Sequence, residues 1–215
     1  MNMNMKNMLR KSFVTCKRMT YIAIWKRPPT STKRIDYLGF IISEDGVEVN
    51  QEKVTAALKW IAPKSVKNVQ EFLGFVNFYR CFIPNFGNLA HPLYDLLKKD
   101  QIWHWGEKEQ DSFKVLKGCL TMAPILIQPN ITKQFFLECD TSDYAMGAIL
   151  SQKTIEGKLL PVCFLSKSFS PAEQNYQIFD KELLAIIHAF KKGPPCPFKF
   201  SQTTKTWNTS QNNEN

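Results

Sequence analysis

The period of the apolar residues changes along this chain, and that change constrains the fold more than any other feature. Between residues 51 and 122, apolar residues recur at helical spacing. Three strand-like runs follow at 135–140, 145–152 and 160–168, separated by the turn-like segments TSDY and TIEGK. Short consecutive strands favour an antiparallel meander. The pattern therefore predicts an α/β (α+β) fold, with a sheet preceded by a small helical region.

Capping residues and prolines set the expected boundaries of the helical region. A hairpin is predicted over 33–50, with one strand at 37–42 and a turn at Glu44-Asp45-Gly46. Asn50 and Ser65 are residue types that cap helices, and they precede two apolar stripes. Four helices are therefore expected here, over 51–60, 66–82, 89–98 and 108–120.

A strong start signal precedes the helical pattern that follows the strands. Ser170 is placed as the N-cap, Pro171 as the first helical residue, and Glu173 completes a capping box. One helix is predicted over 171–192, ended by Gly193 and two prolines. Residues 201–215 are polar and are predicted to be a disordered tail.

The positive charge of the chain is confined to its start. The formal net charge is +9, from 28 basic and 19 acidic residues. Residues 1–35 hold nine of the basic residues and no acid, so the remainder is formally neutral. Net charge therefore gives no support for a basic nucleic-acid-binding surface on the fold. We interpret residues 1–34 as an irregular basic segment.

Composition also bounds the compartment and the partners. No apolar run approaches the roughly 18 residues that a membrane helix needs, so no membrane partner is expected. The six cysteines form no C-x-x-C pair and are interpreted as reduced thiols of an intracellular protein. Cytoplasm and nucleus stay open as compartments, as does the oligomeric state.

Two carboxylates are candidate metal ligands. Asp140 lies at the end of the first strand after 134, where its side chain can enter a site. Glu182 lies on the last helix, with Ile178 and Ile186 four residues away, and is predicted to lie on the apolar face. A buried Glu is costly unless it is paired, hydrogen-bonded or metal-bound. Carboxylates on a strand end and a helix are suited to hold Mg²⁺.

Structural alternatives exist for each acidic residue. Asp140 can act as a turn-capping Asp in the DTSD segment, and Glu182 can extend from a boundary position to solvent. Asp143, in the same segment, is interpreted as a turn residue. The residues alone leave these alternatives open.

Six motifs in order carry a resemblance to a known family. They are YLGFIIS (37–43), SVKNVQEFLGFVNFYRCFIPNF (65–86), HPLYDLLKKD (91–100), APILIQP (123–129), ECDTSDYAMGAILSQ (138–152) and NYQIFDKELLAIIHAFKK (175–192). Together they resemble the Pol polyprotein of gypsy-like long-terminal-repeat retrotransposons. The resemblance covers about residues 35–192.

The resemblance implies an anatomy, an activity and a partner. Residues 35–50 resemble the end of the reverse transcriptase palm, 51–130 the helical thumb and connection, and 131–200 the N-terminal half of a ribonuclease H-like domain with a mixed sheet. The family hydrolyses the RNA strand of RNA–DNA hybrids with Mg²⁺. Asp140 and Glu182 match two of its catalytic residues and metal ligands.

The chain departs from the family pattern at its end. The family's next catalytic Asp lies in a strand similar to S/T-D-H-K-N-L-E-Y-F, where this chain reads SQTTKTWNTS. Plausible codons read in a shifted frame restore that motif, so we hypothesise frameshifts at the tail and in the basic segment. The sheet is then expected to be truncated, without its fourth and fifth strands. We expect Mg²⁺ binding to be weak or absent and hydrolysis to be lost. A Mg²⁺-dependent ribonuclease H and a non-catalytic hybrid-binding or protein-interaction remnant both stay open.

Overall fold

The structure is a computed structural model that describes residues 34–130, 132–192 and 200–202. The predictions for residues 1–33 and 203–215, including the frameshift hypothesis, lie outside these ranges. None of the helices in the described part of the chain has the length and apolar character needed to cross a bilayer. The division of the chain at residues 50 and 130 into a palm end, a helical thumb and connection, and an RNase H-like half remains a prediction.

A three-stranded antiparallel sheet begins the described chain, formed by β1 (Arg34–Tyr37), β2 (Phe40–Ser43) and β3 (Val47–Val49). The prediction of a single strand over 37–42 is wrong, because the chain reverses at Leu38 and Gly39. Both residues have positive φ, 52° and 83°, as a two-residue hairpin turn requires. The predicted turn before β3 is confirmed, since the Ser43 amide donates to the Gly46 carbonyl at 2.8 Å.

The helical region is confirmed, with corrected boundaries. The Asn50 side chain accepts from the Glu52 amide at 2.7 Å and the Ser65 hydroxyl from the Asn68 amide at 3.3 Å, so both predicted caps form. The second helix ends earlier than predicted, and a separate 3₁₀ turn precedes Pro84. The elements are α2 (Gln51–Leu58), α3 (Val66–Phe78), η1 (Arg80–Phe82), α4 (Phe86–Leu89), α5 (His91–Asp95) and α6 (Glu107–Thr121). The third predicted helix, over 89–98, is the shorter α5, and a separate short helix, α4, precedes it.

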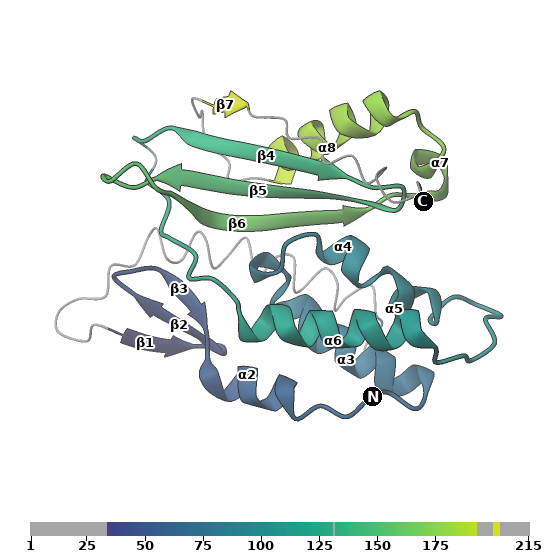
Figure 1. Ribbon diagram of the computed structural model, residues 1–215. Helices are drawn as coiled ribbons and strands as arrows, with labels where there is room; N and C mark the ends of the chain where they lie inside the picture. Colours follow the sequence, from purple (N-terminus) through teal and green to yellow (C-terminus); the bar gives the residue numbers. More distant parts are fainter. Residues whose placement is uncertain (1–33, 131, 193–199, 203–215) are drawn as a thin grey trace, which may run out of the picture.

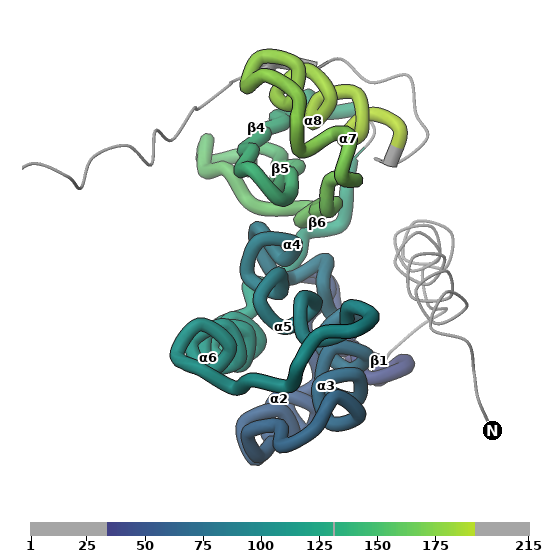
Figure 2. The backbone as a smooth tube through the Cα atoms, turned by 90° about the vertical axis from the view of Figure 1, so that its right-hand side faces the viewer, coloured from purple at the N-terminus to yellow at the C-terminus, as the bar shows by residue number. Residues whose placement is uncertain are grey.

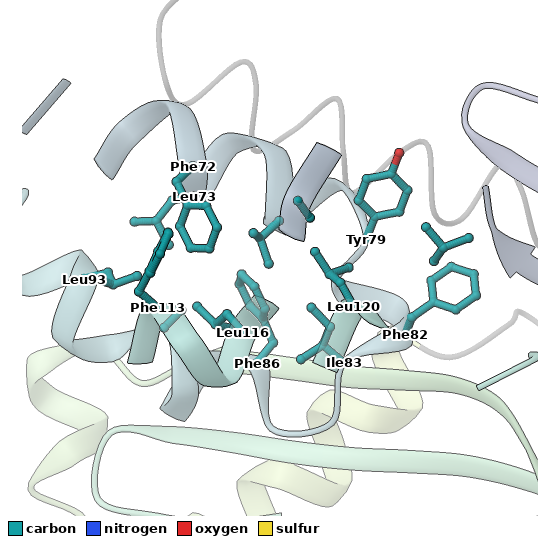
Figure 3. Packing of buried hydrophobic residues seen from close by; sticks show 14 of the residues in the cluster. Phe72, Leu73, Tyr79, Phe82, Ile83, Phe86, Leu93, Phe113, Leu116 and Leu120 are labelled. Carbon is teal, nitrogen blue, oxygen red and sulfur yellow. The ribbon is translucent and has the colours of Figure 1, made fainter. Parts of the chain in front are cut away.

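One aromatic-rich core holds the helical region together (Figure 3). Phe72 of α3 and Phe113 of α6 lie with ring centroids 4.6 Å apart, and both are almost fully buried. The predicted apolar stripe of α3 continues to Tyr79, which is 3% exposed. Burial, with a smaller contribution from Asp36, raises the pKa of Tyr79 to about 12. The stripe read from the sequence is therefore the inner face of the helical region.

The second sheet contains the predicted meander and one strand more. β4 (Phe135–Thr141), β5 (Ala145–Lys153) and β6 (Leu159–Ser168) pair antiparallel. β7 (Phe200–Gln202) pairs parallel with β4, giving the order β6-β5-β4-β7. The prediction of a sheet without a fourth strand is therefore wrong, and so is the predicted disorder at residues 201 and 202. Pairing with β7 satisfies backbone groups along part of β4 that an edge strand would leave open.

The last predicted helix is two helices. α7 (Pro171–Gln174) starts with the predicted capping box, in which the Ser170 amide donates to Glu173 Oε2 at 2.7 Å. Asn175 ends α7, and α8 (Ile178–Lys192) begins after a short irregular segment. Residues 171–192 are therefore not one continuous helix as predicted.

The second sheet lies between α8 and the helical region (Figures 1 and 2). α8 packs on β4 and β5, whereas α4 packs on β5 and β6. Phe135 and Leu137 of β4 share a buried cluster with Ala185 and Ala189 of α8. Since side chains alternate along a strand, the residues of β4 between these apolar ones face away from α8.

Candidate functional site

Asp140 lies near the end of β4, on the face of the sheet that points away from α8. It pairs across the strands with Gly147 of β5. Glu138 and Asp140 line a pocket of about 280 Å³, together with Pro84 and Asn85 from the segment before α4. The pocket lies where the helical region meets the second sheet. The strand-end position predicted for Asp140 is therefore confirmed, and the structure adds residues from the helical region to its surroundings.

Asn85 is the hydrogen-bond partner of Asp140. Its side-chain Nδ2 donates to Asp140 Oδ2 at 3.0 Å across 55 positions of sequence. Asn85 has left-handed backbone angles, φ 48° and ψ 33°. A Cβ at Gly147 would lie only 1.8 Å from Asn85 Oδ1, so the glycine makes room for the amide. This contact joins a loop of the helical region to the candidate site.

Further hydrogen bonds fix the same junction. The Gly87 amide donates to Ser166 Oγ of β6 at 2.7 Å, and Arg80 donates to the Ser166 carbonyl. The Ser142 hydroxyl, just after β4, donates to Asn88 Oδ1. The segment from η1 to α4 is therefore held against the second sheet at several points, and Asn85 lies among them.

Glu182 is half-buried on α8, but its surroundings differ from the prediction. Of the two isoleucines predicted to be its apolar neighbours, Ile178 is 51% exposed and Ile186 is half-buried. The buried stripe of α8 consists of Lys181, Ala185 and Ala189. Glu182 precedes the buried Ala185 by three residues and Ala189 by seven, so it lies at the edge of the face that α8 turns toward the sheet.

Lys181 is the α8 side chain that reaches the β4–β5 turn. It is 5% exposed, and its Nζ lies 3.2 Å from Oδ1 of the exposed Asp143. This pairing agrees with the interpretation of Asp143 as a turn residue. Neither Lys181 nor Asn85 was predicted from the sequence. Lys181 could have been singled out, because it lies four and eight residues before Ala185 and Ala189 on one stripe of the helix. No local pattern points to Asn85, since its contact with Asp140 spans 55 positions.

A second polar cluster joins α7, α8 and β6 away from the pocket. Lys167 Nζ lies 2.9 Å from Glu173 Oε1 and 2.7 Å from His188 Nε2. The Ser170 backbone amide and Lys167 lower the pKa of Glu173 to about 2. The cluster stabilises the start of α7 and its attachment to the sheet.

The donor set near Asp140 does not fit a two-ion hydrolytic centre. Such a centre clamps the attacking and leaving oxygens between two ions, which several carboxylates must hold. Within residues 34–130, 132–192 and 200–202, no three His, Cys, Asp or Glu side chains are grouped so that they could hold a metal ion. Burial raises the pKa of the neighbouring Cys139 to about 11, so its thiol stays protonated.

The sequence of this chain is similar to those of reverse transcriptase and retrotransposon proteins. Residues 105–197 match the RNase H-like domain found in reverse transcriptase. The chain is 42% identical over 158 residues, 74% of its length, to the transposon Tf2-3 and Tf2-4 polyproteins of Schizosaccharomyces pombe. It spans only 12% of the length of these polyproteins.

Solved structures of foamy viral protease-reverse transcriptase share the fold. The complex with dsDNA has a TM-score of 0.65 at 22% identity, covering 80% of this chain and 37% of that one. The complex with RNA/DNA hybrid has a TM-score of 0.63 at 22% identity, covering 79% and 24%. These structures share the fold. The retrotransposon match confirms the predicted family, and the chain belongs to the RNase H-like reverse transcriptase region of gypsy-type retrotransposon polyproteins.

Proposed function

We propose that this chain is a reverse transcriptase-associated module that binds RNA–DNA hybrid without hydrolysing the RNA strand. The observation that carries the proposal is the environment of Asp140. Its carboxylate is hydrogen-bonded to Asn85, and the α8 side chain that reaches the adjacent turn is the cation Lys181. A protein ammonium group beside this turn opposes the binding of a second cation there.

The fold supports a hybrid as the partner. The foamy viral protein, which shares this fold, was solved in complex with RNA/DNA hybrid and also with dsDNA. Because Asp140 faces away from α8, which carries Glu182, a hydrated Mg²⁺ would be held weakly and by Asp140 without Glu182, since Mg²⁺ keeps several waters and needs only one or two carboxylates. That ion would supply charge neutralisation next to a phosphate.

An active Mg²⁺-dependent ribonuclease H is the second candidate. It is favoured by the retention of Asp140 at the end of β4, in a pocket, and by the half-buried Glu182 on α8. In this reading both residues are catalytic metal ligands. The two candidates predict the same binding and opposite outcomes for cleavage.

Binding and cleavage by the full chain separate these candidates. A labelled RNA–DNA hybrid and a matched DNA duplex would be titrated at several salt concentrations, and RNA products would be followed with Mg²⁺ or Mn²⁺. We expect salt-dependent binding of the hybrid and no RNA cleavage. Absence of hybrid binding would overturn the proposal.

The variant Asp140→Asn and its matched control Asp143→Asn complete the test. The control removes a carboxylate of the neighbouring turn that lines no part of the pocket. RNA cleavage that is lost in Asp140→Asn and kept in Asp143→Asn would establish the active ribonuclease reading instead.

A further inference from the structure

We propose that Asn85 is a positioning residue for Asp140: the helical region supplies the hydrogen bond that holds the carboxylate in one orientation at the end of β4. The inference deepens the proposed function and rests on it for the ligand that Asp140 would meet. It assigns to a loop of the helical region a role in the site of the second sheet. Nothing in the RNase H-like match itself includes this loop, since the match begins at residue 105.

The backbone of Asn85 fits this role. A non-glycine residue with φ 48° and ψ 33° lies in the left-handed region, where Asn is tolerated better than most residues. Glycine would adopt the same angles with less strain but has no side-chain amide. Asn combines the required backbone with a donor, and that donor is 3.0 Å from Asp140 Oδ2.

The opposing surface is shaped to receive the loop. A Cβ at Gly147 would lie 1.8 Å from Asn85 Oδ1 and 2.9 Å from its Cγ. A Cβ at Gly87 would lie 2.7 Å from Ser166 Oγ and 2.8 Å from the Ala145 Cβ. Both glycines therefore permit an approach that any larger residue would prevent. The loop and the sheet therefore fit closely at Gly147, which pairs with Asp140, and at Ser166, which pairs with Gly147.

One fixed oxygen restricts the whole carboxylate. Because Nδ2 of Asn85 holds Oδ2, rotation of the Asp140 side chain about χ1 breaks a hydrogen bond to a charged group. A carboxylate already held in one rotamer loses less entropy when it meets a ligand. Docking of the helical region and orientation of Asp140 are consequently linked.

The test measures the Asp140 rotamer directly. Three-bond couplings from the backbone N and C′ to Cγ of Asp140 would be recorded by NMR on the labelled full chain. We expect a single χ1 rotamer in the wild type. The variant Asn85→Gly keeps the left-handed backbone, removes the amide, and should give averaged couplings. A single rotamer in Asn85→Gly, or averaged couplings in the wild type, would overturn the inference.

Asn88→Ala is the matched control, because Asn88 contacts Ser142 at the same junction and does not contact Asp140. It should keep the single Asp140 rotamer, whereas averaged couplings in this variant would assign the effect to general loosening of the junction and refute a specific role of Asn85.

A second measurement removes the acceptor of the hydrogen bond and observes its donor. Asp140→Ala should shift the side-chain amide signals of Asn85 and leave those of Asn88 unchanged; unchanged Asn85 signals would contradict the inference.

Hybrid binding measured on the same samples separates this inference from the proposed function. A wild type with one Asp140 rotamer and no hybrid affinity would refute the proposed function and leave the positioning role intact. A wild type that binds hybrid while Asn85→Gly keeps one rotamer would refute the positioning role alone.

Discussion

Replacing Gly147 with alanine tests the fit between the helical region and the second sheet. The new Cβ would lie 1.8 Å from Asn85 Oδ1, whereas ordinary contacts begin near 3.4 Å. The amide must therefore move by about 1.5 Å or more, and it then loses its hydrogen bond to Asp140. In an ordinary strand the same change would be mildly stabilising, because glycine costs conformational entropy.

The expected magnitude follows from two contributions. Overpacking costs typically about 1–3 kcal/mol, and a hydrogen bond to a charged group contributes about 1.5–3 kcal/mol. Asp140 is half-buried, so water recovers part of the second contribution. We therefore expect Gly147→Ala to lower the free energy of unfolding by about 2–4 kcal/mol.

Urea unfolding followed by circular dichroism measures this loss. With a slope of about 2 kcal/mol per molar urea, the midpoint should fall by about 1–2 M. Gly118→Ala is the matched control, since it lies in α6 and its Cβ would meet nothing within 4 Å. The control should raise stability by about 0.5–1 kcal/mol, as expected for glycine replaced in a helix.

The same substitution made in an Asn85→Gly background tests whether the clash with the Asn85 side chain causes the loss of stability. The background variant removes the clashing side chain, and the remaining contact, to the Cα of residue 85, is an ordinary 3.6 Å. In this background, Gly147→Ala should become nearly neutral. An equal loss in both backgrounds, or no loss in the wild type, would refute the proposed fit.

Two further predictions concern stability. Glu173→Gln should lower stability by about 0.5–2 kcal/mol near neutral pH, the usual cost of a lost cap. The pKa of Glu173 is lowered from 4.5 to about 2, so the stability that its carboxylate contributes is present above pH 4.5 and is lost as the pH falls toward 2. Urea melts at several pH values should therefore show the stability difference between Glu173→Gln and the wild type vanishing near pH 2. Phe72→Ala should cost about 3–5 kcal/mol, since the ring is fully buried. Ile102→Ala, at an 83% exposed position, is its control and should change stability by less than about 0.5 kcal/mol; similar losses in both would contradict the assigned core.

Features that depend on neighbours in sequence were predictable. The caps at Asn50, Ser65 and Ser170 and the buried stripe of α3 follow from local chemistry and helical period. The hairpin at Leu38 was missed, because leucine is an unusual residue at a position with φ 52°. The break between α7 and α8 was also missed, since the capping signal and the apolar stripe belong to different helices.

The sequence by itself determined the strand meander, the helix starts and the position of Asp140 at a strand end, since alternation and capping are local properties of the chain. Only the tertiary structure decided what surrounds that carboxylate. Asn85 reaches Asp140 across 55 positions, and β7 adds parallel to β4 without an alternating pattern of its own. Such contacts arise from the packing of separate elements, where one missing Cβ at Gly147 admits a side chain that no local rule could place there.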